Sequence, residues 1–374
     1  MPSRRRVKPR ERKSNSLVRH SHLVVSTPSL LIGYHIEKTA GSALMKWLHK
    51  QVNEPARLTC LFDYMTTNCF FALHSDLFPA WADAWTFERC GTDVAPNWTR
   101  SALALEFHGY SKYRFWSILG KQLPALRKKY ASLGGPLITT TTIREPTAHI
   151  QSSYFMWPPY IGPKVASRSC RDTRRPRPAG ISCPVAVPLP SWLPFAVGLQ
   201  VGSLTLSSSH TPKARGWHNP LGCSKLESAR ERLASFDVVG VLECTSALLL
   251  VLSFRMGWTI DEPKLGLAIA QALRRRPHGI TQGGALWRSL QAWQPSQLNA
   301  TTQSALRRAA ACDGHLYNDA LARMRRHLAE AMSDDYRQHV AAHASANCSE
   351  CARLLPVAVP PQKRCRREDS VQEG

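Results

Sequence analysis

A run of eight residues combines a lysine, a glycine and two hydroxyl groups between an expected strand and an expected helix. The run reads His35-Ile36-Glu37-Lys38-Thr39-Ala40-Gly41-Ser42. A turn that opens a helix presents backbone N–H groups and the positive end of the helix to an anion. Lys38 and the hydroxyls of Thr39 and Ser42 add charge and donors, so the run predicts a phosphate-binding loop. It departs from a Walker A loop because Glu37 replaces the glycine that precedes the lysine there.

A second candidate phosphate site follows a strand that is rich in threonine. Arg144 comes at the end of this strand, and a guanidinium group can form paired hydrogen bonds with a phosphate. Ser152 comes eight residues later, about two turns into the helix that should begin at Pro146. Either segment alone is also compatible with a purely structural role. The two together favour a ligand that carries phosphate groups.

Hydrophobic periodicity and residue type predict the elements that position these segments. We expect strands over residues 29–34, 103–107, 136–143 and 236–242. We expect helices from residue 43 onward and over residues 116–130, 226–233, 245–256 and 303–342. Strands that alternate with helices in this way favour an α/β fold with a parallel sheet.

The chain divides into one large domain and less regular segments. Residues 1–27 are basic and are expected to be disordered, residues 28–355 form the domain, and residues 356–374 form a polar tail. Within the domain, neither a helical nor a strand period lasts over residues 158–223. So long a stretch without periodicity is unusual in a compact domain. We interpret it as a disordered insertion or as sequence outside the functional protein.

The net charge of +23 is unusually high and unevenly distributed. Residues 1–20 and residues 158–222 each carry a net charge of +7, which leaves about +9 for the rest of the chain. A domain of that charge suits an anionic cofactor or an acidic polymer. A nucleic-acid partner is not favoured, because the charge lies in irregular segments and is not interleaved with aromatic residues.

Cysteines and glycosylation sequons favour a secretory compartment. The chain has eleven cysteines and three sequons, which begin at Asn97, Asn299 and Asn347. A single C-x-x-C, Cys348 to Cys351, is weak support for zinc and is interpreted as a local disulfide or free thiols. No run approaches the roughly 18–20 apolar residues of a membrane span, so the sequence predicts no transmembrane anchor in this chain.

The order of these motifs resembles that of the carbohydrate (Golgi-type) sulfotransferases, which use 3′-phosphoadenosine-5′-phosphosulfate (PAPS). In that family a loop like residues 35–42 cradles the 5′-phosphosulfate, and an R-[DE]-P-x-x-x-x-x-S-x-Y motif, here Arg144 to Tyr154, holds the 3′-phosphate. A third motif is similar to residues 236–243 with 255–258. A closing D-x-x-L-Y motif is similar to residues 313–317. The resemblance covers roughly residues 29–157 and 226–330.

The resemblance implies a three-layer, P-loop-like α/β fold and a set of site residues. The residues implied to bind PAPS are Lys38, Thr39, Ala40, Gly41, Ser42, Arg144 and Ser152. Lys38 would also act in catalysis, as the cation that stabilises the leaving phosphate. His108, at the end of the strand over residues 103–107, would be the general base. Glu106 is the reserve base, and His35 is expected to shape the loop.

The resemblance also implies a partner and a compartment. The acceptor would be a hydroxyl of a carbohydrate, for which an anionic glycan is one candidate, the compartment would be the Golgi lumen, and no metal ion would be required. Three positions depart from the family pattern, namely Glu37, His149 and Cys244. The irregular stretch over residues 158–222 falls where family members build part of their acceptor surface.

Two other classes of function remain open at this stage. A P-loop kinase or NTPase would need a glycine before Lys38 and an aspartate after an apolar strand, where this chain has Glu37 and Glu243. An inactive, basic binding protein related to the sulfotransferases is the other alternative. A comparison of ATP–Mg²⁺ with adenosine 3′,5′-bisphosphate as ligands would separate a nucleotide triphosphatase from a sulfotransferase.

Overall fold

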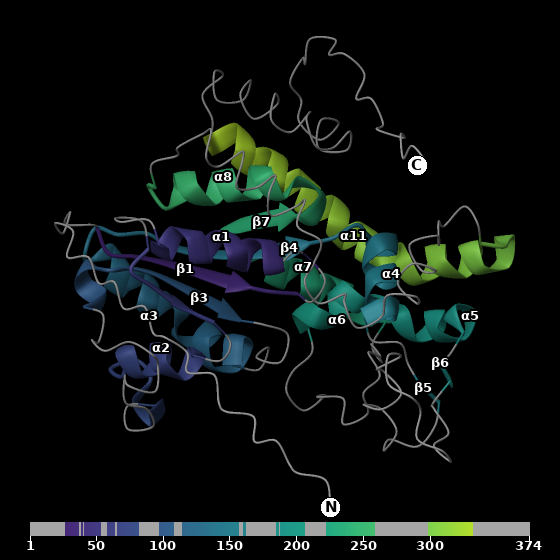
Figure 1. Cartoon of the computed structure of the whole chain (residues 1–374), viewed down its shortest axis with the longest axis horizontal. Helices are drawn as coiled ribbons and strands as arrows, with labels where there is room; N and C mark the ends of the chain where they lie inside the picture. The colour runs from purple at the N-terminus through teal and green to yellow at the C-terminus, as the bar shows by residue number, and fades with distance from the viewer. Residues whose placement is uncertain are drawn as a thin grey trace, which may run out of the picture.

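Five parallel strands form the central sheet of this computed structural model, in the order β2-β3-β1-β4-β7 (Figure 1). The structure describes residues 27–36, 39, 41–53, 58–63, 66–81, 97–107, 114–156, 160–161, 185–186, 188–205, 222–258 and 298–331. The strands are β1 (Ser29–Tyr34), β2 (Cys60–Phe62), β3 (Ala102–Phe107), β4 (Leu137–Ile143) and β7 (Val238–Val241). The expected α/β class with a parallel sheet is therefore confirmed.

The strands are buried on both faces, as parallel strands must be when helices cover each side. Every residue of β1, β3 and β7 is buried. In β4 the threonine run also lies almost entirely inside, and the hydroxyl of Thr141 donates to the carbonyl of Tyr34 on β1 at 2.8 Å. Branching at Cβ suits threonine to a strand, and the hydrogen bond satisfies a hydroxyl that would otherwise be buried without a partner.

One face of the sheet is covered by α1 (Gly41–Asn53) and α8 (Thr245–Arg255), which lie close to the strands at two glycines. A Cβ atom on Gly240 of β7 would lie 2.6 Å from the side chain of Leu248, so α8 can approach the strand only because no side chain is present. A Cβ atom on Gly33 would lie 3.4 Å from Leu44 of α1. The rings of Trp47 and Trp258, 5.4 Å apart, complete this layer.

The opposite face is covered by further helices around an aromatic cluster (Figure 1). These are α2 (Thr67–Leu73), the π-helical η5 (Arg114–Leu119), α3 (Gly120–Ala131), α6 (Leu199–Thr205) and α7 (Leu226–Ala234). The ring of Tyr34 lies 4.6 Å from that of Phe115 and 6.0 Å from that of Phe236. The hydroxyl of Tyr34 donates to the carbonyl of Ser203 at 2.5 Å, which links the end of β1 to α6.

The long helix α11 (Ala300–Ala331) joins the main core to a second, smaller core. Its second half packs along β7 and α8, where the N–H of Val241 donates to the sulfur of Met324 at 3.4 Å. Its first half packs against α4 (Pro146–Met156), α5 (Leu189–Trp192) and η7 (Leu193–Ala196) (Figure 1). The smaller core consists of Ile150, Trp192, Leu193, Ala196, Leu199, Leu306, Ala309 and Ala310.

The prediction that the whole stretch 158–223 lacks structure is wrong for residues 188–205. These residues form α5, η7 and α6, and the side chains of Trp192, Gln200 and Val201 are each at most 1% exposed. The segments are short, contain proline and are buried on several sides, so no helical period could be read from the sequence. The stretch also contributes the short antiparallel pair β5 (Tyr160–Ile161) and β6 (Val185–Ala186).

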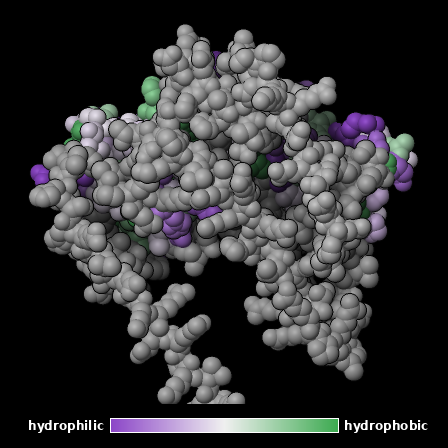
Figure 2. Space-filling model, turned by 45° about the horizontal axis from the view of Figure 1, so that its top comes forward, coloured by the Kyte–Doolittle hydropathy of each residue, from purple (hydrophilic) through white to green (hydrophobic). Residues whose placement is uncertain are grey.

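The remaining short elements are η1 (Pro79–Trp81), η3 (Trp98–Arg100), η9 (Gly222–Lys225) and η10 (Leu242–Cys244). Among the helices that the structure describes, none is both long and apolar enough to cross a membrane. Large exposed apolar side chains among the described residues are Val52, Leu133, Phe195 and Phe254. They come from separate elements, and the described residues visible in Figure 2 show no broad hydrophobic patch. Most of residues 1–27, the tail 356–374 and the C-x-x-C lie outside the described residues.

Candidate functional site at the carboxyl edge of the sheet

The two predicted phosphate segments follow neighbouring strands of the sheet. After β1 the chain leads through α1 to β2 at one side of the sheet, whereas after β4 it leads to β7 at the other side. Strands β1 and β4 pair directly, with Tyr34 opposite Thr141. Ligands of open α/β sheets bind where the connections of neighbouring strands diverge in this way. The carboxyl ends of β1 and β4 are therefore the candidate site.

The loop after β1 is described only in part. Lys38 and Ala40 lie outside the described residues, and so does Glu37. The Thr39 side chain is fully buried, and its hydroxyl donates to the carbonyl of Ile36 at 2.6 Å. The N–H of Thr39 donates to the same carbonyl at 3.2 Å, which closes a tight turn. Gly41 and Ser42 begin α1, so the N–H groups of its first turn lie at this edge of the sheet.

A buried histidine–carboxylate pair joins the ends of β1 and β3. Glu106 lies opposite Gly33 in the sheet register, and Gly33 precedes His35 by two residues. The Nδ1 atom of His35 lies 3.0 Å from Oε1 of Glu106, and the two side chains are 9% and 2% exposed. The N–H of His35 also donates to the carbonyl of Phe107 at 2.8 Å. The reserve base Glu106 is therefore buried against His35, whereas His108 lies outside the described residues.

Arg144 comes directly after β4, and hydrogen bonds hold its backbone in place. Its N–H donates to Oε1 of Gln200 at 2.8 Å, and its carbonyl accepts from Nε2 of Gln200 at 2.9 Å. Burial lowers the pKa of the guanidinium, while the carboxylates of Glu243 and Glu145 act in the opposite direction. The arginine thus lies in a partly desolvated position with two acidic neighbours.

Glu145 and Pro146 start the helix that carries the predicted Ser152. The carboxylate of Glu145 accepts from the N–H groups of Thr147 and Ala148 at 2.9 and 2.6 Å, which caps α4. Proline suits the first helical position because it has no N–H to satisfy. Ser152 lies two turns along α4 and is half-buried, so Arg144 and Ser152 belong to one strand–loop–helix unit.

His149, one of the departures from the family pattern, is buried on the same helix. Its side chain is 3% exposed, and its N–H donates to the carbonyl of Glu145 at 2.8 Å. The side chain of Ser153 is 4% exposed. The face of α4 that carries these two residues is therefore internal.

Glu243, at the end of β7, connects this unit to α11. Its Oε1 accepts from the N–H of Glu145 at 3.1 Å, and its Oε2 accepts from the hydroxyl of Tyr317 at 3.2 Å. Burial raises the pKa of the Glu243 carboxyl, and the hydrogen bonds and Arg144 partly offset that effect. Cys244, another departure from the family pattern, is buried and disulfide-bonded.

Two buried residues of the network, Gln200 and Asp313, meet at the start of α6. The N–H of Gln200 lies 3.1 Å from both carboxylate oxygens of Asp313, and the N–H of Val201 donates to Oδ1 at 3.0 Å. Burial raises the pKa of Asp313 to about 7, although these N–H groups favour the charged form. Asp313 belongs to the closing motif noted in the sequence. Gln200 was missed, since a single glutamine in a proline-rich stretch carries no signal.

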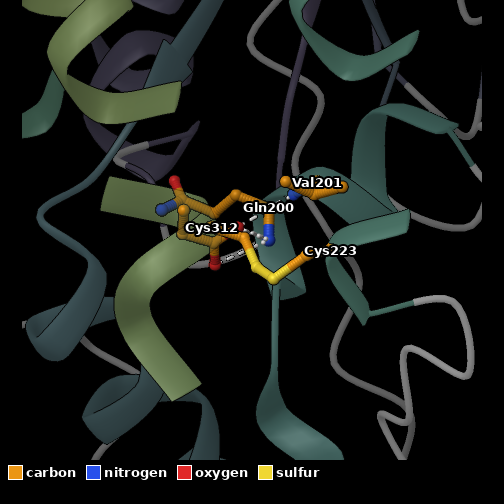
Figure 3. Close-up of a disulfide and its surroundings, with 5 residues drawn as sticks. Gln200, Val201, Cys223 and Cys312 are labelled. Carbon is orange, nitrogen blue, oxygen red and sulfur yellow. Dashed lines mark hydrogen bonds between the residues drawn. A yellow bond between two sulfur atoms is a disulfide. The ribbon is translucent and has the colours of Figure 1, made fainter. Parts of the chain in front are cut away.

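A disulfide anchors α11 at the residue that precedes Asp313. Cys223 of η9 and Cys312 of α11 are joined, with a Cα–Cα distance of 5.5 Å and a sequence separation of 89. Figure 3 shows this disulfide beside Gln200 and Val201. Among the cysteines that the structure describes, Cys60 is the free thiol, and burial raises its pKa to about 11.

Within the described residues, no group of three or more His, Cys, Asp or Glu side chains is placed to hold a metal ion. A scan against models of known protein families found no match to this chain, and neither did a search of curated proteins. The resemblance to sulfotransferases therefore rests on the sequence motifs, and the structure shows an α/β fold with a five-stranded parallel sheet.

Proposed function

We propose that this protein is a carbohydrate sulfotransferase, which transfers a sulfuryl group from PAPS to a hydroxyl of a glycan. The observation that carries the proposal is the pairing of β1 with β4. It brings the loop of residues 35–42 and the segment from Arg144 to Ser152 to adjacent strand ends, about 5 Å apart across the sheet. PAPS carries a phosphosulfate at the 5′ position of its ribose and a phosphate at the 3′ position, so a single nucleotide would engage both segments.

The proposed reaction is an in-line displacement at sulfur. The acceptor oxygen forms a bond to sulfur while the bond from sulfur to the bridging phosphate oxygen breaks, which releases adenosine 3′,5′-bisphosphate. Lys38 would balance the charge that develops on the bridging oxygen, and His108 would accept the proton of the acceptor hydroxyl. N–H groups of the first turn of α1 would bind the phosphosulfate. Arg144 would bind the 3′-phosphate.

The acceptor and the compartment belong to the same proposal. A basic domain suits an anionic glycan, because opposite charge raises the encounter rate and the local concentration. The disulfide between Cys223 and Cys312 favours an oxidising compartment such as the secretory pathway. The sequon residues Asn97 and Asn299 are exposed and so are accessible to glycosylation.

A transfer assay with labelled PAPS and a panel of sulfated and unsulfated glycans tests the proposal. The wild-type chain should label at least one glycan, and Lys38→Ala should lose nearly all of this transfer while its near-ultraviolet circular dichroism stays the same. Lys46→Ala, on α1, is the matched control and should keep the wild-type rate. Transfer by Lys38→Ala at the wild-type rate would rule out the role of Lys38. Tight binding of ATP–Mg²⁺ with none of adenosine 3′,5′-bisphosphate would support a kinase or NTPase instead.

A further inference from the structure

The backbone of Arg144 is held by a side chain where the sheet has ended. The last residue of β4 is Ile143, which pairs with Val241 of β7. One residue further on, the carboxamide of Gln200 supplies the two hydrogen bonds that a neighbouring strand would supply. It accepts from the Arg144 N–H at 2.8 Å and donates to the Arg144 carbonyl at 2.9 Å. The two bonds act on both sides of one Cα atom, so they fix the direction in which the Cα–Cβ bond of Arg144 leaves the backbone.

Gln200 is itself held from a distant part of the chain. Its side chain is 0% exposed, and its N–H lies against the carboxylate of Asp313, 113 residues later in sequence. Asp313 is also 0% exposed, and the preceding residue, Cys312, is disulfide-bonded to Cys223. Buried polar groups that are fully satisfied make a rigid unit, because any movement leaves a donor or an acceptor without a partner.

We infer that Gln200, anchored by Asp313, is a positioning residue that aims Arg144 at the 3′-phosphate of the nucleotide. The inference rests on the proposed function, in which Arg144 makes that contact. A paired guanidinium–phosphate contact requires two phosphate oxygens to lie near the plane of the guanidinium, so a small rotation of the Arg144 backbone weakens it. Selectivity for a 3′-phosphorylated nucleotide therefore depends on residues 188–205, which contain none of the recognised motifs.

The test compares two ligands on the full chain, adenosine 3′,5′-bisphosphate and adenosine 5′-monophosphate, by titration calorimetry. Gln200→Met keeps the length of the side chain and removes both hydrogen bonds. We expect the ratio of the two affinities to fall about tenfold, through the bisphosphate alone. Gln51→Met is the matched control, since Gln51 is a buried glutamine on α1 whose amide donates to the carbonyl of Trp47. Its affinity ratio should equal that of the wild type.

A second variant remains informative if Gln200→Met does not fold. Gln200→Glu retains the acceptor for the Arg144 N–H and, when protonated, also a donor for the Arg144 carbonyl. Burial raises the pKa of such a carboxyl. At pH 8 the affinity ratio of Gln200→Glu should therefore be lower than that of the wild type. At pH 5 the two ratios should become similar. A residue that only stabilised the fold would lower both affinities together at every pH.

The outcomes separate the inference from the proposed function. Suppose that Arg144→Ala loses the discrimination between the two nucleotides. A wild-type affinity ratio in Gln200→Met, or in Gln200→Glu at pH 8, then overturns the positioning role. Equal losses for both nucleotides in the Gln200 variants overturn it as well. If Arg144→Ala itself keeps the wild-type ratio, the 3′-phosphate site is misplaced, and the proposed function at this site fails together with the inference.

Discussion

The two ends of the candidate site are built in different ways. At the β1 and β3 end, the polar contacts come from residues next to each other in the sheet, and His35 reaches Glu106 across one strand spacing. At the β4 and β7 end, Arg144 depends on Gln200 and, through it, on Asp313, which lie on different helices. The first end is fixed by the register of two paired strands, although His35 and Glu106 lie 71 positions apart in sequence. The second end requires that helices outside the sheet pack against the end of a strand.

The difference predicts a division of labour. In the proposed reaction the first end carries the groups that act on sulfur and on the acceptor, so damage there should lower turnover. In the same proposal the second end would bind the 3′-phosphate and not the sulfuryl group, so damage there should lower nucleotide affinity and selectivity. Variants at each end test this distinction.

The largest effect is expected for His108→Ala at the first end. Loss of a general base lowers turnover by roughly 10²–10⁴-fold, and nucleotide affinity should stay the same. The wild-type rate should rise with pH through an apparent pKa near that of an imidazole, and the variant should lose this rise. Steady-state kinetics across pH measure both, with His49→Ala on α1 as the control.

Two results would contradict this assignment for His108. One is normal turnover with weakened nucleotide binding, and the other is an unchanged pH profile. Glu106→Gln is then the variant to test, because Glu106 lies two residues earlier in sequence and belongs to β3.

Removal of the disulfide should destabilise the second end. The double variant Cys223→Ser/Cys312→Ser frees a loop of 89 residues, and we expect the free energy of unfolding to fall by about 2–5 kcal/mol. Urea unfolding followed by fluorescence measures the change. Cys60→Ser is the control, because Cys60 is the free thiol among the described cysteines. Equal midpoints for the double variant and the wild type would show that the bond adds no stability.

Arg144→Ala should weaken binding of adenosine 3′,5′-bisphosphate by ~1–3 kcal/mol, the range for a charged hydrogen-bonded contact. Ser152→Ala should weaken it less, because a hydroxyl carries no charge. Binding of adenosine 5′-monophosphate should change little in either variant. Arg308→Ala, on the exposed side of α11, is the control. Equal losses for both nucleotides would mean that neither residue contacts the 3′-phosphate.

The last prediction concerns how the free energy of unfolding depends on pH. The folded-state pKa of Asp313 is raised to about 7 from 3.8, so the folded protein keeps a proton that the unfolded chain releases. The contribution of Asp313 to the free energy of unfolding is fully present below about pH 4. It is lost as pH rises toward 7, by at most about 1.4 kcal/mol per pH unit. The stability of the wild type relative to Asp313→Asn should therefore fall between pH 4 and pH 7 and level off above. A constant difference across this range would contradict the shift.

Much of the fold could be predicted from the sequence, because its main elements are long and have a clear period. The strands β1, β3, β4 and β7 and the helices α1, α3, α7 and α8 lie where the pattern indicated them, and so does α11 as far as residue 331, beyond which the predicted helix lies outside the described residues. Strand β2 was missed because it has only three residues, Cys60–Phe62. Helices α5 and α6 were missed because their apolar faces contact several neighbours, so no single face is marked in the sequence.

The site was predictable only where its residues form a local pattern. Arg144 and Ser152 stand at a fixed spacing within one strand–loop–helix unit, and the structure keeps them there. The contact of Gln200 with Arg144 joins residues 56 positions apart, and periodicity carries no information about such pairs. Glu106 could be placed on a strand from its sequence, whereas its burial against His35 follows from the register of β1 with β3.

The late position of α11 in the chain constrains the order of assembly during synthesis. Four strands of the sheet are complete at residue 143, and β7 follows at residue 241. Contacts between residues so far apart form only after the intervening chain has emerged and closed into a loop. A nascent chain exposed as far as residue 258 would therefore hold all five strands and still lack Asp313. The contact of Asp313 with Gln200, on which the position of Arg144 depends, is thus the last part of the site to form.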